Sequence, residues 1–198
     1  MSAAVAIMEE IQASGCNGAA CHAQMYIMGT LLRHGSAEQK ARYLPGIARG
    51  ELRLQAFGVT EPSSGTDTLS LRTTAVRDGD CYVINGQKIW TSRAEHSDLM
   101  LLLARTTPRP PPNPPPLTGE GRVGALRTAG LSVFLVDMRE AKEHGLTIRP
   151  IRTMMNHATT EVFFENMRVP AENLIGNEGE GGRYILSGMN AERILIAA

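Results

Sequence analysis

The residues best suited to chemistry lie in a short polar stretch that follows an apolar run. Residues 57–67 read FGVTEPSSGTD. Such a loop offers hydroxyl groups and unhindered backbone N–H groups, which suit a carbonyl-rich ring or a phosphate. Composition alone favours a simpler interpretation, a polar turn between two strands. The stretch as a whole is still a candidate binding loop.

A second candidate stretch contains the only tryptophan of the chain, Trp90, followed by Thr91 and Ser92. A lone tryptophan usually lies in the core. Beside two hydroxyl side chains, its indole could instead stack near a flat cofactor. Taken alone, this pattern leaves both interpretations open.

Together the two stretches resemble the acyl-CoA dehydrogenase family. Several ordered motifs carry the resemblance, and they are far more specific together than singly. They span nearly all the chain outside a proline-rich segment. The motifs are VTEPSSGTD at 59–67, INGQKIWTS at 84–92, LLLAR at 101–105, GLSVFLVD at 130–137, RTMMN at 152–156, EVFFENMRVPAENLIG at 161–176 and MNAERILIAA at 189–198.

The resemblance implies that the first stretch lines one side of an FAD isoalloxazine ring and that residues 90–92 border the other side. The binding residues that it implies in the first stretch are Phe57, Val59, Thr60, Gly65 and Thr66. Ser92 would hydrogen-bond to the reactive flavin edge, while Thr66, Asn190 and Arg193 would contact the acyl-CoA. The implied reaction is α,β-dehydrogenation of the thioester. In it, a carboxylate base removes the α-proton while a hydride passes to flavin N5.

Glu192 is the best candidate for that base. It resembles the base of the isovaleryl and long-chain branches, which lies on this helix just before an arginine. Other branches place the base in a later helix that is absent here. The alternative is a surface glutamate beside Arg193, a pair of little energetic value. Glu61 is also acidic, but as part of the loop motif it is expected to shape the turn.

Helices are expected at both ends of the chain. Apolar residues recur at helical spacing over 4–11, 19–33 and 184–198. Ser36 and Gln39 form a capping-box pattern that opens a third helix, which Pro45 and Gly46 are expected to break or kink. The last helix is apolar and uncapped at the chain end, which indicates further sequence downstream.

The middle of the chain has the pattern of strands joined by short turns. Asp78-Gly79 and Asn85-Gly86 predict turns, the second being the stronger hairpin signal. The run 99–104 is almost wholly apolar, as expected for a strand buried on both faces. Residues 106–130 are rich in proline and predict a disordered loop; a proline-rich recognition site for a partner is the alternative.

Composition narrows the class of protein. The 198 residues include 20 Lys plus Arg and 20 Asp plus Glu, a formal net charge of zero, so no nucleic-acid partner is expected. Three cysteines without CxxC spacing argue against disulfides and against a metal site. No membrane span or targeting segment is visible, so we expect a cytoplasmic bacterial protein, or a mitochondrial-matrix protein if the source is eukaryotic.

The expected fold is α+β in three parts: a partial N-terminal helical domain (1–52), a central antiparallel β-barrel domain that binds flavin (53–176), and the first helix of a truncated C-terminal helical domain (177–198). The resemblance implies an electron-transfer flavoprotein as acceptor and a homodimer or homotetramer. The alternatives are a truncated, non-catalytic fragment, an acyl-CoA oxidase-like flavoprotein, and a β-barrel interaction module that uses the proline-rich loop.

Overall fold

The computed structural model describes residues 2–107, 130–154 and 158–197. Its helices are α1 (Ser2–Ala13), α2 (Ala19–His34), α3 (Ala37–Ala48), α5 (Met138–Ala141) and α6 (Gly181–Ile196). Its strands are β1 (Leu54–Gly58), β2 (Thr74–Asp78), β3 (Cys81–Ser92), β4 (Leu99–Arg105), β5 (Leu131–Asp137), β6 (Leu146–Pro150), β7 (Thr159–Pro170) and β8 (Leu174–Ile175). Most of the proline-rich segment, 108–129, lies outside the described residues, so the expectation about it stays untested.

The start of α3 confirms the capping-box prediction. The Ser36 hydroxyl accepts a hydrogen bond from the Gln39 N–H at 3.1 Å, and the Gln39 side chain accepts one from the Ser36 N–H at 3.0 Å. The expected break at Pro45 and Gly46 does not occur, because α3 continues to Ala48. A proline inside a helix removes one i→i−4 hydrogen bond, and here the rest of the helix tolerates that loss.

The eight strands form one open sheet, with the order β6-β7-β3-β2-β4-β5-β8 and with β1 paired to β4. The expectation of a closed antiparallel barrel is therefore corrected in two respects. The strands at the ends of this order, β6 and β8, are not paired with each other. In addition, β1 and β2 both pair with β4 in parallel. The coarser expectation, an α+β fold, is confirmed.

The predicted turn at Asn85-Gly86 is wrong. These residues lie within β3 and make no turn, and the β2–β3 hairpin turns instead at Asp78-Gly79. Pairing with β7 holds β3 extended on both sides of a bulge at this point. Across the bulge, the Asn85 side chain accepts a hydrogen bond from the Asn166 N–H at 2.8 Å. Long-range strand pairing thus overrides the local turn preference of Asn-Gly.

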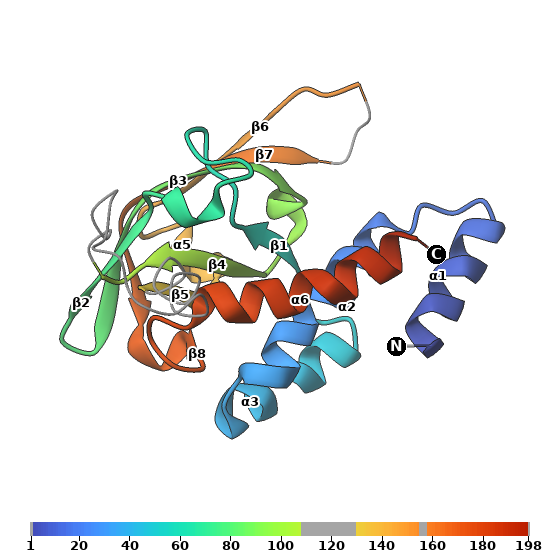
Figure 1. Ribbon diagram of the computed structural model, residues 1–198, viewed down its shortest axis with the longest axis horizontal. Helices are drawn as coiled ribbons and strands as arrows, with labels where there is room; N and C mark the ends of the chain where they lie inside the picture. The colour runs from blue at the N-terminus through green and yellow to red at the C-terminus, as the bar shows by residue number, and fades with distance from the viewer. Residues whose placement is uncertain (1, 108–129, 155–157, 198) are drawn as a thin grey trace, which may run out of the picture.

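Strands β4 and β5 are buried on both faces, as the apolar run predicted. Leu99, Leu101 and Leu103 face a core shared with α2, α3 and α6, whereas Met100 and Leu102 face a second core shared with β3 and β7. Figure 1 shows α6 crossing the molecule beside α2, and both helices pack against the sheet. None of the helices described here is long and apolar enough to cross a lipid bilayer.

Candidate functional site

A long loop, residues 59–73, leaves the sheet between two strands that share one edge of β4. Leu54 to Gly58 of β1 pair along Leu99 to Leu102, and Thr74 of β2 pairs at Arg105. The other edge of β4 is taken by β5. The chain must therefore bulge outward between β1 and β2, which exposes the predicted binding loop at this edge.

The loop lies against the end of β3. The Ile89 N–H donates to the Thr60 carbonyl oxygen at 2.9 Å, and Lys88 Nζ donates to the Val59 carbonyl oxygen at 3.1 Å. Lys88 and Ile89 are the two residues before Trp90. The structure therefore brings together the two stretches that the sequence analysis predicted to converge.

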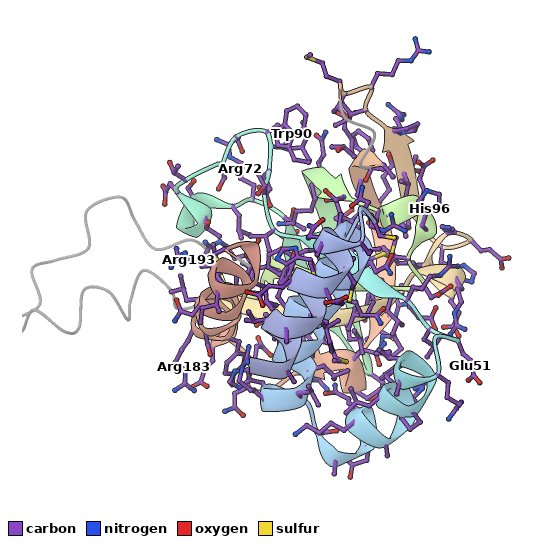
Figure 2. The ribbon with its side chains drawn as sticks, turned by 90° about the vertical axis from the view of Figure 1, so that its right-hand side faces the viewer. Glu51, Arg72, Trp90, His96, Arg183 and Arg193 are labelled. Carbon is purple, nitrogen blue, oxygen red and sulfur yellow. The ribbon has the colours of Figure 1, made fainter. Side chains whose placement is uncertain are left out.

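Trp90 lies on a bulge, where β3 skips its pairing with β7 between Lys88 and Thr91. Its backbone has a φ of 60°, a strained value for a bulky residue. Its side chain is 59% exposed, so the indole is not part of the core. Figure 2 shows Trp90 standing out from the body of the protein. Strained backbone of this kind is common at functional sites.

The predicted residues of the two stretches differ in exposure. Ser92 is exposed, as are Gly65 and Thr66 at the crown of the loop, whereas Thr60 is half-buried. Thr91 is buried, and its hydroxyl oxygen has no hydrogen-bond partner within the described part of the chain. Both segments that meet at this junction thus carry an exposed hydroxyl residue, Thr66 on the loop and Ser92 beside the exposed Trp90.

The remaining predicted residues, Asn190, Glu192 and Arg193, lie on α6, which packs beside α2. The Tyr26 ring packs edge-on against Phe57 with centroids 5.4 Å apart. Burial raises the pKa of the Tyr26 hydroxyl, and the neighbouring Glu192 carboxylate raises that pKa further. Glu192 is therefore near enough to Tyr26 to act on it electrostatically, and Tyr26 contacts Phe57 near the end of β1. On the same helix, an Arg193 Nη atom donates to the Asn190 side chain at 3.4 Å.

Comparison with known proteins identifies the family. Residues 56–167 match the acyl-CoA dehydrogenase middle domain, and residues 1–51 match the acyl-CoA dehydrogenase N-terminal domain. This chain belongs to the acyl-CoA dehydrogenase family. These two matches confirm the resemblance found in the sequence, because the N-terminal domain of the family precedes its middle domain along this chain as well.

Known acyl-CoA dehydrogenases agree in sequence and structure. FadE26 of Mycobacterium tuberculosis is 37% identical over 169 residues, which are 85% of this chain and 38% of that protein. The crystal structure of an acyl-CoA dehydrogenase from Geobacillus kaustophilus has a TM-score of 0.82 at 31% identity, covering 98% of this chain and 47% of that one. A glutaryl-coenzyme A dehydrogenase in complex with glutaryl-CoA has a TM-score of 0.72 at 30% identity, covering 88% and 41%. The chain spans less than half the length of each.

The residues of the loop 59–73 and of the end of β3 have side chains that fit a flavin. An isoalloxazine ring is flat and has polar atoms along its edge. The site offers an exposed indole for the flat face, exposed hydroxyl groups at Thr66 and Ser92, and the buried Thr91 hydroxyl that lacks a partner among the described residues. Aromatic faces and hydroxyl groups are suited to a ring of this kind.

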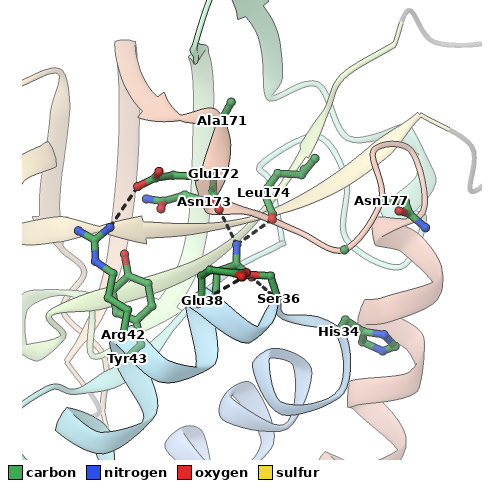
Figure 3. A pocket seen from close by; sticks show the side chains of 12 residues that line it. His34, Ser36, Glu38, Arg42, Tyr43, Ala171, Glu172, Asn173, Leu174 and Asn177 are labelled. Carbon is green, nitrogen blue, oxygen red and sulfur yellow. Dashed lines mark hydrogen bonds and ion pairs between the residues drawn. The ribbon is translucent and has the colours of Figure 1, made fainter.

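A hollow in the described part of the surface lies away from this loop. A cavity of about 650 Å³ opens between the start of α3 and residues 171–177 (Figure 3). Gln39 crosses it by donating two hydrogen bonds, to the carbonyl oxygens of Glu172 and Leu174. None of its lining residues is a predicted site residue. The predicted residues of the loop and of the end of β3 therefore lie outside this cavity.

Sequence reasoning missed Lys88, the side chain that joins the two halves of the site. Its Nζ lies 2.8 Å from Glu61 Oε1, and both side chains are buried. One signal was available. Lys88 lies an even number of residues from the buried residues Tyr82 and Ile84 of β3, which places it on the same face of the strand. A charged residue on the inward side of a strand requires a partner.

Proposed function

We propose that this chain supplies the flavin-binding part of an enzyme that carries out FAD-dependent α,β-dehydrogenation of an acyl-CoA thioester. The observation that carries the proposal is the junction between the loop and the end of β3, where Ile89 and Lys88 bind the carbonyl groups of Thr60 and Val59. That junction joins the loop that carries Thr66 to the strand end that carries Trp90 and Ser92, and all three residues are exposed. Family membership supports the same reaction.

Within this proposal, the side chains form two walls around the ring. Trp90 provides a flat apolar wall, Ser92 donates a hydrogen bond from the same strand end, and Thr91 lies behind them. Phe57 and the backbone of Val59, Thr60 and Gly65 provide the other wall, with Thr66 between ring and substrate. Bound FAD supplies the capacity to accept a hydride; the protein supplies position and electrostatics.

The proposed proton acceptor is the Glu192 carboxylate, which removes the α-proton of the thioester. Asn190 and Arg193 lie on the same helix and are proposed to hold the thioester near it. The proximity of Glu192 to Tyr26, which packs on Phe57, supports this placement. A relative with a glutaryl-CoA complex supports an acyl-CoA as the substrate class.

We further propose the domain limits 1–52, 53–176 and 177–198, with an electron-transfer flavoprotein as the onward acceptor and a homodimer or homotetramer as the assembly. The source decides between a cytoplasmic and a mitochondrial-matrix location. An oxidase reaction is the alternative chemistry on the same site, and measuring peroxide release during turnover separates the two.

The first test is flavin retention. Purified protein should be yellow and should bleach when an acyl-CoA is added without an electron acceptor. Trp90→Ala should lower the flavin content, because it removes the flat wall, whereas Trp90→Phe should retain more of it. A colourless wild-type preparation that takes up no added FAD would instead support the non-catalytic fragment.

The second test concerns the base. In protein that bleaches with substrate, Glu192→Gln should keep its flavin but lose bleaching, because an amide cannot accept the α-proton. Glu9→Gln, an exposed change on α1, is the matched control and should bleach normally. Bleaching at the wild-type rate in Glu192→Gln would remove Glu192 as the base.

A further inference from the structure

The Lys88–Glu61 ion pair differs from every other ion pair found among the described residues. Its side chains are 0% and 3% exposed. In each of the other pairs, at least one partner is more than half exposed. Removing two charges from water is costly, and well-packed apolar residues often stabilise a fold as well or better. Stability alone is therefore a weak explanation for a pair in this place.

The pair joins separate parts of the chain at one point. Lys88 Nζ binds both Glu61 Oε1, at 2.8 Å, and the Val59 carbonyl oxygen, at 3.1 Å. The Glu61 carboxylate also accepts the backbone N–H of Arg72 at 2.6 Å and of Thr73 at 2.9 Å. The start and the end of the loop are thus tied to β3 through two side chains.

Each group of the pair favours the charged form of the other. Burial opposes ionisation of Glu61, but Lys88 and the hydrogen bonds from Thr73 and Arg72 outweigh it and hold the Glu61 pKa below its usual value. Burial lowers the pKa of Lys88 to about 8, against the attraction of Glu61. The contacts are therefore charge-assisted hydrogen bonds, which are stronger and more directional than neutral ones.

The position of the pair relates it to the proposed site. Lys88 lies two residues before Trp90, and Glu61 lies between Thr60 and the exposed crown at Gly65 and Thr66. The crown is held internally, by Ser64 donating to the Asp67 carbonyl oxygen at 2.6 Å. Among the described residues, Lys88–Glu61 is the only ion pair that joins the loop to the strand end.

We infer that Lys88 and Glu61 are positioning residues that hold the binding loop at a set distance from the Trp90 strand end, so that both walls of the flavin site are formed before the cofactor arrives. The inference rests on the proposed function for its ligand, but the loop geometry that it claims can be measured without one. A preformed site binds more tightly because less ordering remains to be done on binding.

The test compares Lys88→Met, Glu61→Gln and the double variant with two buried controls on β7, outside the loop, Val169→Ala and Met167→Ala. Hydrogen exchange of the amides in residues 59–73 and at Ile89 reports loop order. Titration with FAD, followed by flavin fluorescence, reports affinity. Both are measured at a temperature where each protein is folded. Should Lys88→Met fail to fold, Glu61→Gln decides, because it keeps the side-chain shape and removes the charge.

We expect each single variant to expose the amides of Arg72 and Thr73 to exchange and to weaken FAD binding about tenfold or more. The controls should lose comparable thermal stability while their loop exchange and FAD affinity stay at wild-type levels. The double variant should regain stability lost by Lys88→Met, because no buried charge is left unpaired, without regaining loop protection or affinity.

Two outcomes would overturn the inference. One is loop protection in Lys88→Met and Glu61→Gln equal to that of the wild type. The other is loop exchange and FAD affinity that follow thermal stability across all variants, controls included, as a purely structural pair would give. If the wild-type chain binds no FAD, the proposed function fails, and the exchange measurement still decides the positioning role.

Discussion

Replacing Gly176 with alanine should destabilise the link between β8 and α6 through two separate effects. Gly176 has a φ of +67°, a left-handed conformation that costs an alanine roughly 1–2 kcal/mol. A Cβ atom there would also lie 2.5 Å from Tyr184 Cε2 and 2.7 Å from its Cζ and hydroxyl oxygen. These separations are too short, so the ring would have to move.

Moving the Tyr184 ring would disturb three interactions at the start of α6. Its hydroxyl oxygen accepts the Asn177 N–H at 3.1 Å and donates to Glu180 Oε2 at 2.7 Å. Its ring stacks on His34 with centroids 4.1 Å apart. Loss of one or two such hydrogen bonds adds about 1–3 kcal/mol. The whole change in the free energy of unfolding is then about 2–5 kcal/mol.

Gly50 provides the matched control. Its φ is +75°, and a Cβ atom there would have no neighbour within 4 Å. Gly50→Ala therefore carries the conformational cost and the same change in unfolded-state entropy, without the collision. Urea unfolding of both variants should show Gly176→Ala to be less stable than Gly50→Ala by about 1–3 kcal/mol. Equal destabilisation within about 0.5 kcal/mol would refute the collision with Tyr184.

Three further predictions concern other parts of the fold. Ser36→Ala should lower the free energy of unfolding by about 1 kcal/mol, because the cap on α3 is lost, and Ser36→Asp should restore most of it in the same urea titration. Phe134→Ala should lower the free energy of unfolding by about 3–5 kcal/mol, since this ring is fully buried and its centroid lies 4.9 Å from that of the Tyr82 ring. A loss below about 1 kcal/mol in urea unfolding would contradict the packing. The pKa of Lys88 is about 8 in the folded protein, below the usual 10.5. Between these two pH values the unfolded chain therefore binds more protons than the folded protein. The free energy of unfolding should rise with pH across that window, relative to that of Lys88→Met. A pH-independent difference would contradict the lowered pKa.

Local patterns predicted the elements whose stability is itself local. The capping box of α3 needs only residues three apart, and it is present as expected. The apolar run of β4 predicted burial on both faces, because an apolar residue at every position leaves no face for solvent. The ordered motifs were enough to identify the family, which the domain matches confirm.

The predictions that failed were those in which a local preference competed with distant pairing. Asn85-Gly86 favours a turn, but the pairing of β3 with β7 keeps it extended. A Cβ on Gly86 would lie 2.7 Å from Thr73 Cα, so this glycine permits a close approach of two segments rather than a turn. Likewise, nothing in the sequence showed that β1 and β2 would share one edge of β4 and leave the sheet open.

The sequence alone was sufficient to give the order of motifs that identifies the family, because each motif is a property of a short segment. Only the tertiary structure decided that Glu61 lies against Lys88, which is 27 residues away, and that Glu192 lies near Tyr26. Charges far apart in sequence have no local signal for each other. They meet because hydrophobic burial and strand pairing bring their segments together, and once they are buried the cost of an unpaired charge holds them there.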